Sequence, residues 1–249
     1  MRMSAASRAN VMEGLTTDRQ TWTDAIESFD FPFDLVAFRE SDGRTDLSLY
    51  YALPVGPFSE ASSADTLSVE VGVALHDSVW TPVVEEAVIL RFLPIDDAAA
   101  PSIREMRFSV PPDSYHVALH SDLIDSPLLS GYQFERRIPD FSGHETMMSD
   151  VVLASEILPR TNQEPTSRED LHIAANPFHR FALDQPVHVY FEVYHLTLDE
   201  NDLSRYDVTY QIERQEDGGI LDFFRRNASS LSISARFEDV TPSPIHSST

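Results

Sequence analysis

Residues 67–76, LSVEVGVALH, carry an apolar side chain at nearly every second position. Side chains of a β-strand point alternately to its two faces, whereas those of an α-helix repeat every 3.6 residues. The period of two therefore predicts a strand that has one face on a hydrophobic core and the other face toward water.

The same period recurs on both sides of this stretch. It predicts further strands at 35–40, 47–53, 83–93, 103–110, 115–120 and 129–138. Turn residues separate them, among them Ser41-Asp42-Gly43, Pro54-Val55-Gly56-Pro57 and Pro111-Pro112-Asp113. Seven strands in about 110 residues, with no helical spacing between them, are typical of an immunoglobulin- or fibronectin-like β-sandwich. A parallel α/β fold is excluded, because it requires crossover helices.

A second set of strands is predicted at 151–157, 187–194, 206–212 and 231–237, after a polar stretch, Pro139 to Met148, that suits a linker. We therefore expect an all-β chain of two tandem sandwiches. Its predicted parts are a helical or disordered leader at 1–30, a first sandwich at 31–141, a second, incomplete sandwich at 146–240 and a disordered tail at 241–249. A sandwich that lacks strands exposes a sheet edge. Either the gene product is truncated, or a partner completes the sheet.

The charge of the chain is strongly one-sided. Asp and Glu number 41 against 18 basic residues, all of them Arg, and the net charge is -23. Such a surface repels itself at low ionic strength, and roughly 1 M salt screens that repulsion to about 3 Å. Because the acids fall mostly on predicted outward positions, we expect a protein adapted to high salt. The alternative is GC-rich codon usage, which favours Arg over Lys but does not by itself account for the acid excess.

Composition and patterning also argue against several classes of function. No basic patch exceeds the pairs Arg136-Arg137 and Arg225-Arg226, which disfavours nucleic-acid binding. No apolar run approaches the roughly 18 residues of a membrane span, and Met1 to Gly14 do not form a signal peptide. The absence of cysteine excludes disulfides and thiolate chemistry.

Several spaced patterns resemble a known family. They are Met148-Ser-Asp150-Val-Val-Leu-Ala154, Asn176-Pro-Phe-His-Arg-Phe181, Val189-Tyr-Phe-Glu-Val-Tyr-His-Leu196 and Tyr206-Asp-Val-Thr-Tyr210, with Val36-Ala-Phe-Arg39 and Ser48-Leu-Tyr-Tyr-Ala-Leu-Pro54 upstream. Together, over residues 31 to 215, they resemble the β-rich portion of bacterial GWxTD-domain proteins. The resemblance implies tandem β-sandwiches and a periplasmic or extracellular location, without an established activity. The naming signature is absent, since Thr21-Trp22-Thr23-Asp24 lacks the glycine and one residue of spacing.

Candidate chemical groups do not form a catalytic or cofactor pattern. His116 and His120 share a strand face, but positions four apart lie about 13 Å from each other, too far to share one Zn²⁺. Glu85 and Glu86 point to opposite faces of a strand, so they do not form a glycosidase pair. The run from Asp199 to Asp202 lacks the EF-hand pattern, which leaves a solvated turn or a Ca²⁺ site at a module end. We therefore predict no catalytic residue, no metal ligand and no cofactor.

One strand face is a candidate interaction surface. His188, Tyr190, Glu192 and Tyr194 alternate with the apolar residues Val187, Val189, Phe191 and Val193, and we expect them to point outward. Tyrosine is enriched at protein interfaces, so an interface between modules or chains is the preferred interpretation. The expected function is therefore non-catalytic: protein–protein interaction or envelope-associated assembly in a halophilic bacterium, with a protein partner or self-association through an exposed sheet edge. A carbohydrate-binding or carbohydrate-processing accessory module is the alternative.

Overall fold

The computed structural model of the chain describes residues 29–62, 64–93, 101–212 and 231–240. The chain divides into two compact units, residues 1–157 with 173–194 and residues 158–172 with 195–249. The predicted leader up to residue 28 and the tail at 241–249 lie outside the described residues.

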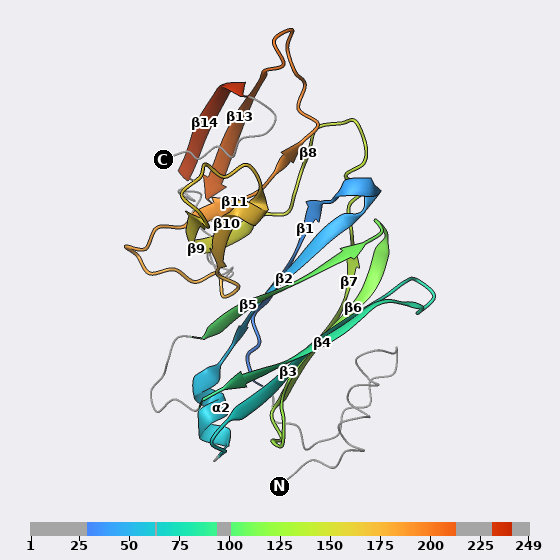
Figure 1. Cartoon of the computed structure of the whole chain (residues 1–249), viewed down its shortest axis with the longest axis vertical. Helices are drawn as coiled ribbons and strands as arrows, with labels where there is room; N and C mark the ends of the chain where they lie inside the picture. Colours follow the sequence, from blue (N-terminus) through green and yellow to red (C-terminus); the bar gives the residue numbers. More distant parts are fainter. Residues whose placement is uncertain (1–28, 63, 94–100, 213–230, 241–249) are drawn as a thin grey trace, which may run out of the picture. The chain divides into compact units, whose positions relative to one another are not determined.

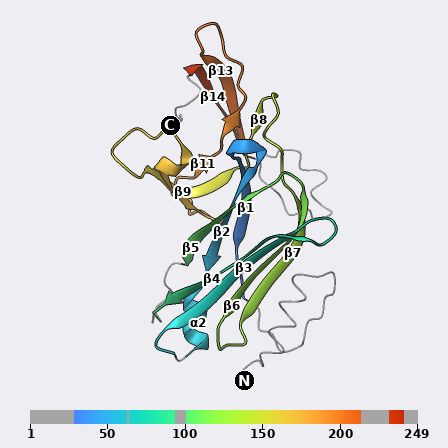
Figure 2. The same cartoon turned by 45° about the vertical axis from the view of Figure 1, so that its right-hand side comes forward.

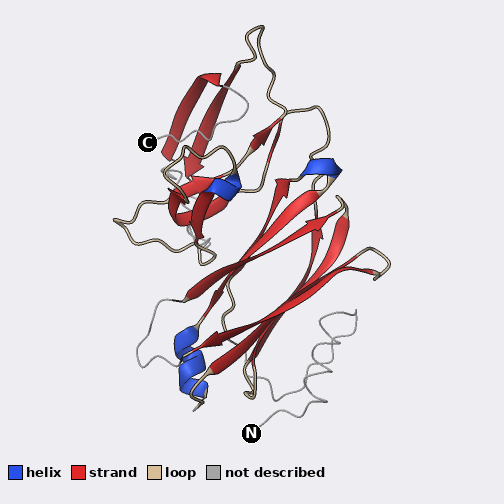
Figure 3. Ribbon diagram, in the orientation of Figure 1, coloured by secondary structure: helices blue, strands red, loops and turns tan. Residues whose placement is uncertain are grey.

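The first unit is built on two antiparallel sheets, which Figures 1 and 2 show as two layers. One has the order β1-β2-β5, formed by β1 (Phe33–Arg39), β2 (Thr45–Leu53) and β5 (Ser102–Val110). The other has the order β4-β3-β6-β7, formed by β3 (Leu67–His76), β4 (Pro82–Phe92), β6 (Ser114–Leu123) and β7 (Leu129–Arg137). Figure 3 shows that strands dominate. The prediction of an all-β, sandwich-like fold is confirmed, and all seven strands of the first set are present.

The core of this unit consists of the alternating apolar residues. The quoted stretch contributes Leu67, Val69, Val71, Val73 and Leu75, each at most 3% exposed. They belong to the same buried cluster as the inward residues of β2, β5 and β6: Leu47, Leu49, Tyr51, Leu53, Met106, Phe108, Val110, Tyr115, Val117 and Leu119. Complete burial of a large apolar side chain contributes roughly 1.5–3 kcal/mol to the stability of the fold. Because the buried side chains are those that alternate along the strands, the period of two is the main determinant of the fold.

Two of the predicted turns have different outcomes in the structure. The turn at Ser41-Asp42-Gly43 is confirmed: it is a short 3-10 segment in which Asp42 and Gly43 have φ values of 65° and 72°, a region that Gly and Asp adopt readily. The turn predicted at Pro54 to Pro57 is wrong, because the helix α2 (Val55–Ala61) begins there. Val55 and Phe58, three residues apart, are both buried, and this helical spacing is too short to stand out in the sequence.

The second face of β2 differs from the prediction. Ser48 and Ala52, on the second face of the strand predicted at 47–53, were expected to face water, but all nine residues of β2 are buried. The polar linker expected at Pro139 to Met148 also contains a core residue, Phe141, which is 2% exposed. Later parts of the chain therefore contact the first sandwich.

Short strands follow, most of whose residues belong to the first unit. A sheet of order β10-β9-β11 joins β9 (Val152–Pro159), β10 (Leu171–Ala175) and β11 (His188–Tyr190), and β8 (Met147–Met148) pairs with β12 (Val193–Tyr194). β8 and β10 were not predicted, since a two-residue strand has no period and β10 is only five residues long. Residues 146–157 and 173–194 thus belong to the same compact unit as the first sandwich. The expected domain border at 141–146 stays a prediction.

The second unit contains an antiparallel pair, β13 (Ser204–Ile212) and β14 (Leu231–Val240). A 3-10 turn, η2 (Arg168–Asp170), is closed by a capping box between Ser167 and Asp170. Strands predicted at 206–212 and 231–237 are confirmed, each extended by a few residues.

Candidate functional site

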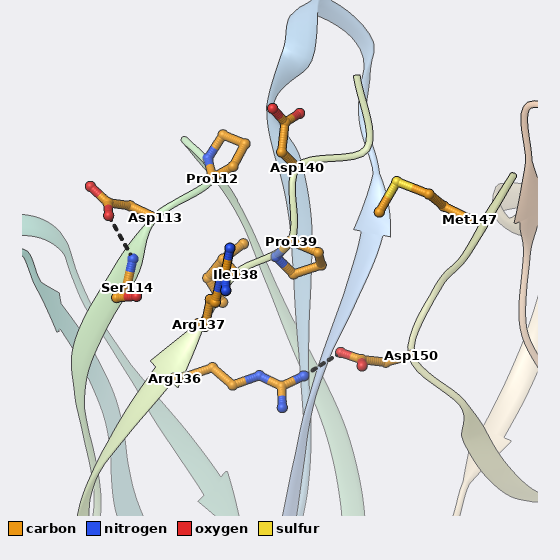
Figure 4. A pocket seen from close by; sticks show the side chains of 10 residues that line it. All are labelled: Pro112, Asp113, Ser114, Arg136, Arg137, Ile138, Pro139, Asp140, Met147 and Asp150. Atoms are coloured by element: carbon orange, nitrogen blue, oxygen red, sulfur yellow. Dashed lines mark hydrogen bonds and ion pairs between the residues drawn. The ribbon is translucent and has the colours of Figure 1, made fainter. Parts of the chain in front are cut away.

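A polar junction on strand β1 brings together residues that lie far apart in the sequence. The Asp150 carboxylate accepts the Ala37 N–H at 2.8 Å, and the Asp150 N–H donates to the Ala37 carbonyl at 3.2 Å. Arg136 of β7 donates to the same carboxylate oxygen at 2.5 Å, as the close-up in Figure 4 shows. β1 is an edge strand of its sheet. Asp150 therefore bonds to backbone groups that a neighbouring strand would otherwise bind.

A second cluster continues from the residue before Asp150. Ser149 and Glu192 exchange two bonds: the Ser149 N–H donates to the Glu192 carbonyl at 2.9 Å, and the Glu192 N–H donates to Ser149 Oγ at 2.8 Å. The Glu192 carboxylate accepts the hydroxyls of Tyr190 at 2.9 Å and Tyr194 at 2.6 Å. The Tyr194 hydroxyl in turn accepts the Arg39 N–H at 2.9 Å. Arg39 and Ala37 are two apart on β1, so both amides point to the same edge.

The side chains of Tyr190 and Tyr194 are buried and do not face solvent. Tyr190 is 8% exposed and its ring centroid lies 5.9 Å from that of Phe38. Tyr194 is 5% exposed, meets Phe141 edge-on at 5.0 Å and has the Arg39 guanidinium 4.8 Å above its ring. The outward orientation predicted for these two side chains is wrong. Burying tyrosine requires a partner for its hydroxyl, and Glu192 supplies one for each.

Three of the four candidate residues lie together in the structure, and the fourth lies apart from them. Tyr190, Glu192 and Tyr194 meet in the junction, whereas His188 stands opposite Ala154 in the β11–β9 ladder. The strict alternation assumed for 187–194 fails because the strand is interrupted at Phe191 and Glu192, where the backbone turns to bond Ser149. Sequence reasoning missed Ser149, Asp150 and Ala37 as partners. The only signal was the Met148-Ser-Asp150 pattern, which was noted without a role.

The outward face of the β4-β3-β6-β7 sheet holds three histidines. His76 and His116 are cross-strand partners, and the Trp80 ring stacks on His116 at 4.3 Å and 5°. His120 stands opposite Gly72, and a Cβ at Gly72 would lie 2.0 Å from His120 Cε1, so glycine leaves the space for this ring. Burial lowers the pKa of His120, and the bond to Glu70 at 3.3 Å partly offsets that shift.

Each of these histidines lies beside a single acid. Within the described part of the chain, no group of three or more His, Cys, Asp or Glu side chains is arranged to hold a metal ion. Glu85 lies 3.8 Å from His76, and Glu135 lies 3.7 Å from His116, so each contact pairs one acid with one histidine. In the second unit, Asp199 Oδ1 accepts the N–H groups of Asn201 and Leu203, which gives the solvated turn considered for this run.

A cleft of about 810 Å³ adjoins the Arg136–Asp150 pair. It is lined by ten residues of both charges, which Figure 4 shows: Pro112, Asp113, Ser114, Arg136, Arg137, Ile138, Pro139, Asp140, Met147 and Asp150. Its acids are used locally: Asp113 accepts the Ser114 N–H, and Ser142 bonds hold the pKa of Asp140 below its usual value.

Comparison with known protein families, curated proteins and solved structures found no match. Among the described residues, no helix is long and apolar enough to cross a membrane. The class that the structure defines is an all-β, sandwich-like protein.

Proposed function

We propose that this chain is a non-catalytic β-sandwich protein that acts through protein–protein contact at the free edge of strand β4. The observation that carries the proposal is the position of β4 at the end of the order β4-β3-β6-β7. No described strand pairs with its other edge. An edge strand offers a row of backbone N–H and C=O groups that can pair with another chain.

The side chains of β4 support this role. None of its eleven residues is buried. Val83 and Ile89 are 40% and 56% exposed, and Leu93, just after the strand, is 73% exposed. Single exposed apolar residues are common on protein surfaces, but a row of them along a long, free edge is typical of a binding surface.

The setting of this contact is also part of the proposal. The resemblance to GWxTD-domain proteins and the net charge of -23 favour envelope-associated assembly in a halophilic bacterium. We further propose that the chain consists of tandem immunoglobulin-like modules, with the β13–β14 pair belonging to the second. The carbohydrate-binding alternative has lost its motivating feature, because Tyr190 and Tyr194 are buried and their rings are not available to stack on a sugar.

A matched pair of variants tests the edge. Ile89→Lys places a charge on the β4 edge, whereas Leu183→Lys makes the same change at a fully exposed position elsewhere. The full chain is titrated with fluorescent 11-residue strand-forming peptides of neutral, acidic and basic composition, and also concentrated alone. Hydrogen exchange is followed at residues 82–92. We expect protection of these amides by a peptide or by a second copy, retained in Leu183→Lys and lost in Ile89→Lys.

The contrary result is equally clear. If the amides of β4 exchange at one rate with every peptide and at every protein concentration, in 0.1 M and 3 M salt, the edge does not pair and the proposal is overturned.

A further inference from the structure

The sequence of β4 is complementary to itself. Its register with β3 sets the two faces: Glu85 stands opposite Ala74, Ala87 opposite Gly72 and Ile89 opposite Glu70 on the outward face. Val84, Val88, Leu90 and Phe92 point to the other face and pack against the core while remaining partly exposed. Both faces of the strand therefore offer side chains to a strand added beside it.

Two copies of one strand that pair antiparallel about a two-fold axis have one residue at the centre, and each other residue faces its mirror position. With Val88 at the centre, Glu85 of each copy faces Arg91 of the other, and Ala87 faces Ile89. On the core side, Val84 faces Phe92 and Val88 faces itself. Each of these four pairs is either apolar with apolar or acid with base. The remaining core-side pair, Glu86 with Leu90, is the one mismatch.

Neighbouring registers lose this match. With Ala87 at the centre, Glu85 faces Ile89 and Arg91 faces Val83. With Ile89 at the centre, Glu85 faces Leu93 and Arg91 faces Ala87. Cross-strand pairs of opposite charge stabilise a sheet, whereas a charge beside an apolar residue loses that contribution. Charge complementarity thus selects the register centred on Val88.

From this match we infer that the partner of the β4 edge is a second copy of this chain, joined by antiparallel pairing of two β4 strands centred on Val88. The inference rests on the proposed function and names its partner. Two four-stranded sheets then become one continuous sheet, and the half-exposed residues Val84, Val88 and Phe92 are covered by their counterparts.

Salt should strengthen this dimer. Each copy has a net charge of -23, so two copies repel each other over roughly 10 Å at 0.1 M salt and only about 3 Å at 1 M. Two Glu85–Arg91 pairs oppose this locally, but they are few against the total charge. We expect the dissociation constant to fall as salt rises.

Cysteine cross-linking tests the register directly, because the chain has no cysteine of its own. Ala87 and Ile89 are both exposed and face each other in the inferred dimer. Directly opposite residues have Cα atoms about 4.5–5.5 Å apart, within the range of a disulfide. A mixture of Ala87→Cys and Ile89→Cys, oxidised at 3 M salt, is expected to give a cross-linked dimer of one copy of each. Each variant alone should give little, because its own cysteines lie beyond the reach of about 7 Å.

The other registers give different products. Efficient cross-linking of Ala87→Cys alone indicates a centre at Ala87, and that of Ile89→Cys alone a centre at Ile89. Either product overturns the register proposed here.

A charge exchange tests the pairing without cysteine. Arg91→Glu and Glu85→Arg each place two like-charged pairs in the dimer, and we expect at least about a tenfold weaker dimer, equivalent to 1.4 kcal/mol. The double variant exchanges the charges and should restore dimerisation to within a few-fold. Sedimentation equilibrium, at the lowest salt concentration at which the parent chain still dimerises, measures these constants, because higher salt screens the charge pairs. Because Glu85 also contacts His76, the thermal unfolding of each monomer is recorded to show that the fold is intact.

The outcomes separate the two proposals. A chain that stays monomeric at all salt concentrations, while a foreign peptide protects residues 82–92, overturns the dimer and leaves the proposed function standing. A double charge variant as weak as the singles overturns the register centred on Val88. If neither a second copy nor a peptide protects the edge, both proposals fail.

Discussion

β1 and β4 are both edge strands of sheets in the same unit, but the backbone groups along their outer edges have different partners. On β1, the amides of Ala37 and Arg39 are bonded by Asp150 and Tyr194. On β4, no described strand occupies the outer edge, and apolar side chains are exposed along it. An edge closed by the chain's own side chains contributes to stability, whereas an open edge is available for recognition. The difference predicts that changes at β1 affect folding, and changes at β4 affect assembly.

The largest expected effect is at the closed edge. Asp150→Ala removes the acceptor of the Ala37 N–H and the partner of the Arg136 guanidinium, and unsatisfied groups of this kind cost about 1–3 kcal/mol each. Because both groups are only partly buried, we expect a loss of about 2–3 kcal/mol in the free energy of unfolding, measured by urea titration at 1 M salt. Asp140→Ala, an exposed acid on the same cleft, is the matched control and should have the smaller effect on the free energy of unfolding. Equal effects of the two variants would mean that Asp150 does not close the edge.

A smaller effect separates the two tyrosines. Tyr194→Phe removes a hydroxyl that donates to Glu192 and accepts from Arg39, whereas Tyr190→Phe removes one bond to Glu192. At about 1 kcal/mol for each bond, we expect losses of about 2 and 1 kcal/mol in the free energy of unfolding. Hydrogen exchange should show the Arg39 amide less protected in Tyr194→Phe and unchanged in Tyr190→Phe. The reverse ranking would contradict the junction described here.

The comparison of edges also shows what the sequence could predict. The seven strands of the sandwich follow from alternation, because burial of one face is a local pattern in residues such as 67–76. The bonds from Asp150 and Tyr194 to β1 span 113 and 155 residues, and no local period encodes such a contact. Tyr190 and Tyr194 were predicted to face outward for the same reason. Alternation assigns two faces, but it does not reveal that the chain returns to cover the second.

The free edge of β4 was expected only in general terms, as an exposed sheet edge in the second sandwich. Among the described strands, the outer edge of β4 in the first sandwich is unpaired, on a strand that the sequence did predict, and the edge expected in the second sandwich stays a prediction. Strand order depends on the pairing of β3 with β6, which is not its neighbour in the sequence, on the side opposite to β4, and periodicity carries no information about it. The match of residues 84–92 with a second, antiparallel copy of themselves is visible in the sequence, but it gains meaning only once β4 is known to lie at the edge of its sheet.

The smallest expected effect is the pH dependence of stability that arises from His120, in the sheet that contains β4. Burial lowers the pKa of His120 in the folded protein, so between that lowered pKa and the ordinary value of about 6.5 the unfolded chain binds more protons. The free energy of unfolding therefore falls as the pH decreases below about 6.5, and this contribution is fully regained above it. His120→Gln should flatten that part of the profile, measured by urea unfolding from pH 7.5 to 5.5. His179→Gln, which changes a half-exposed histidine paired with Asp34, serves as the control. A profile as steep in His120→Gln as in the parent chain would show that another group senses the acid.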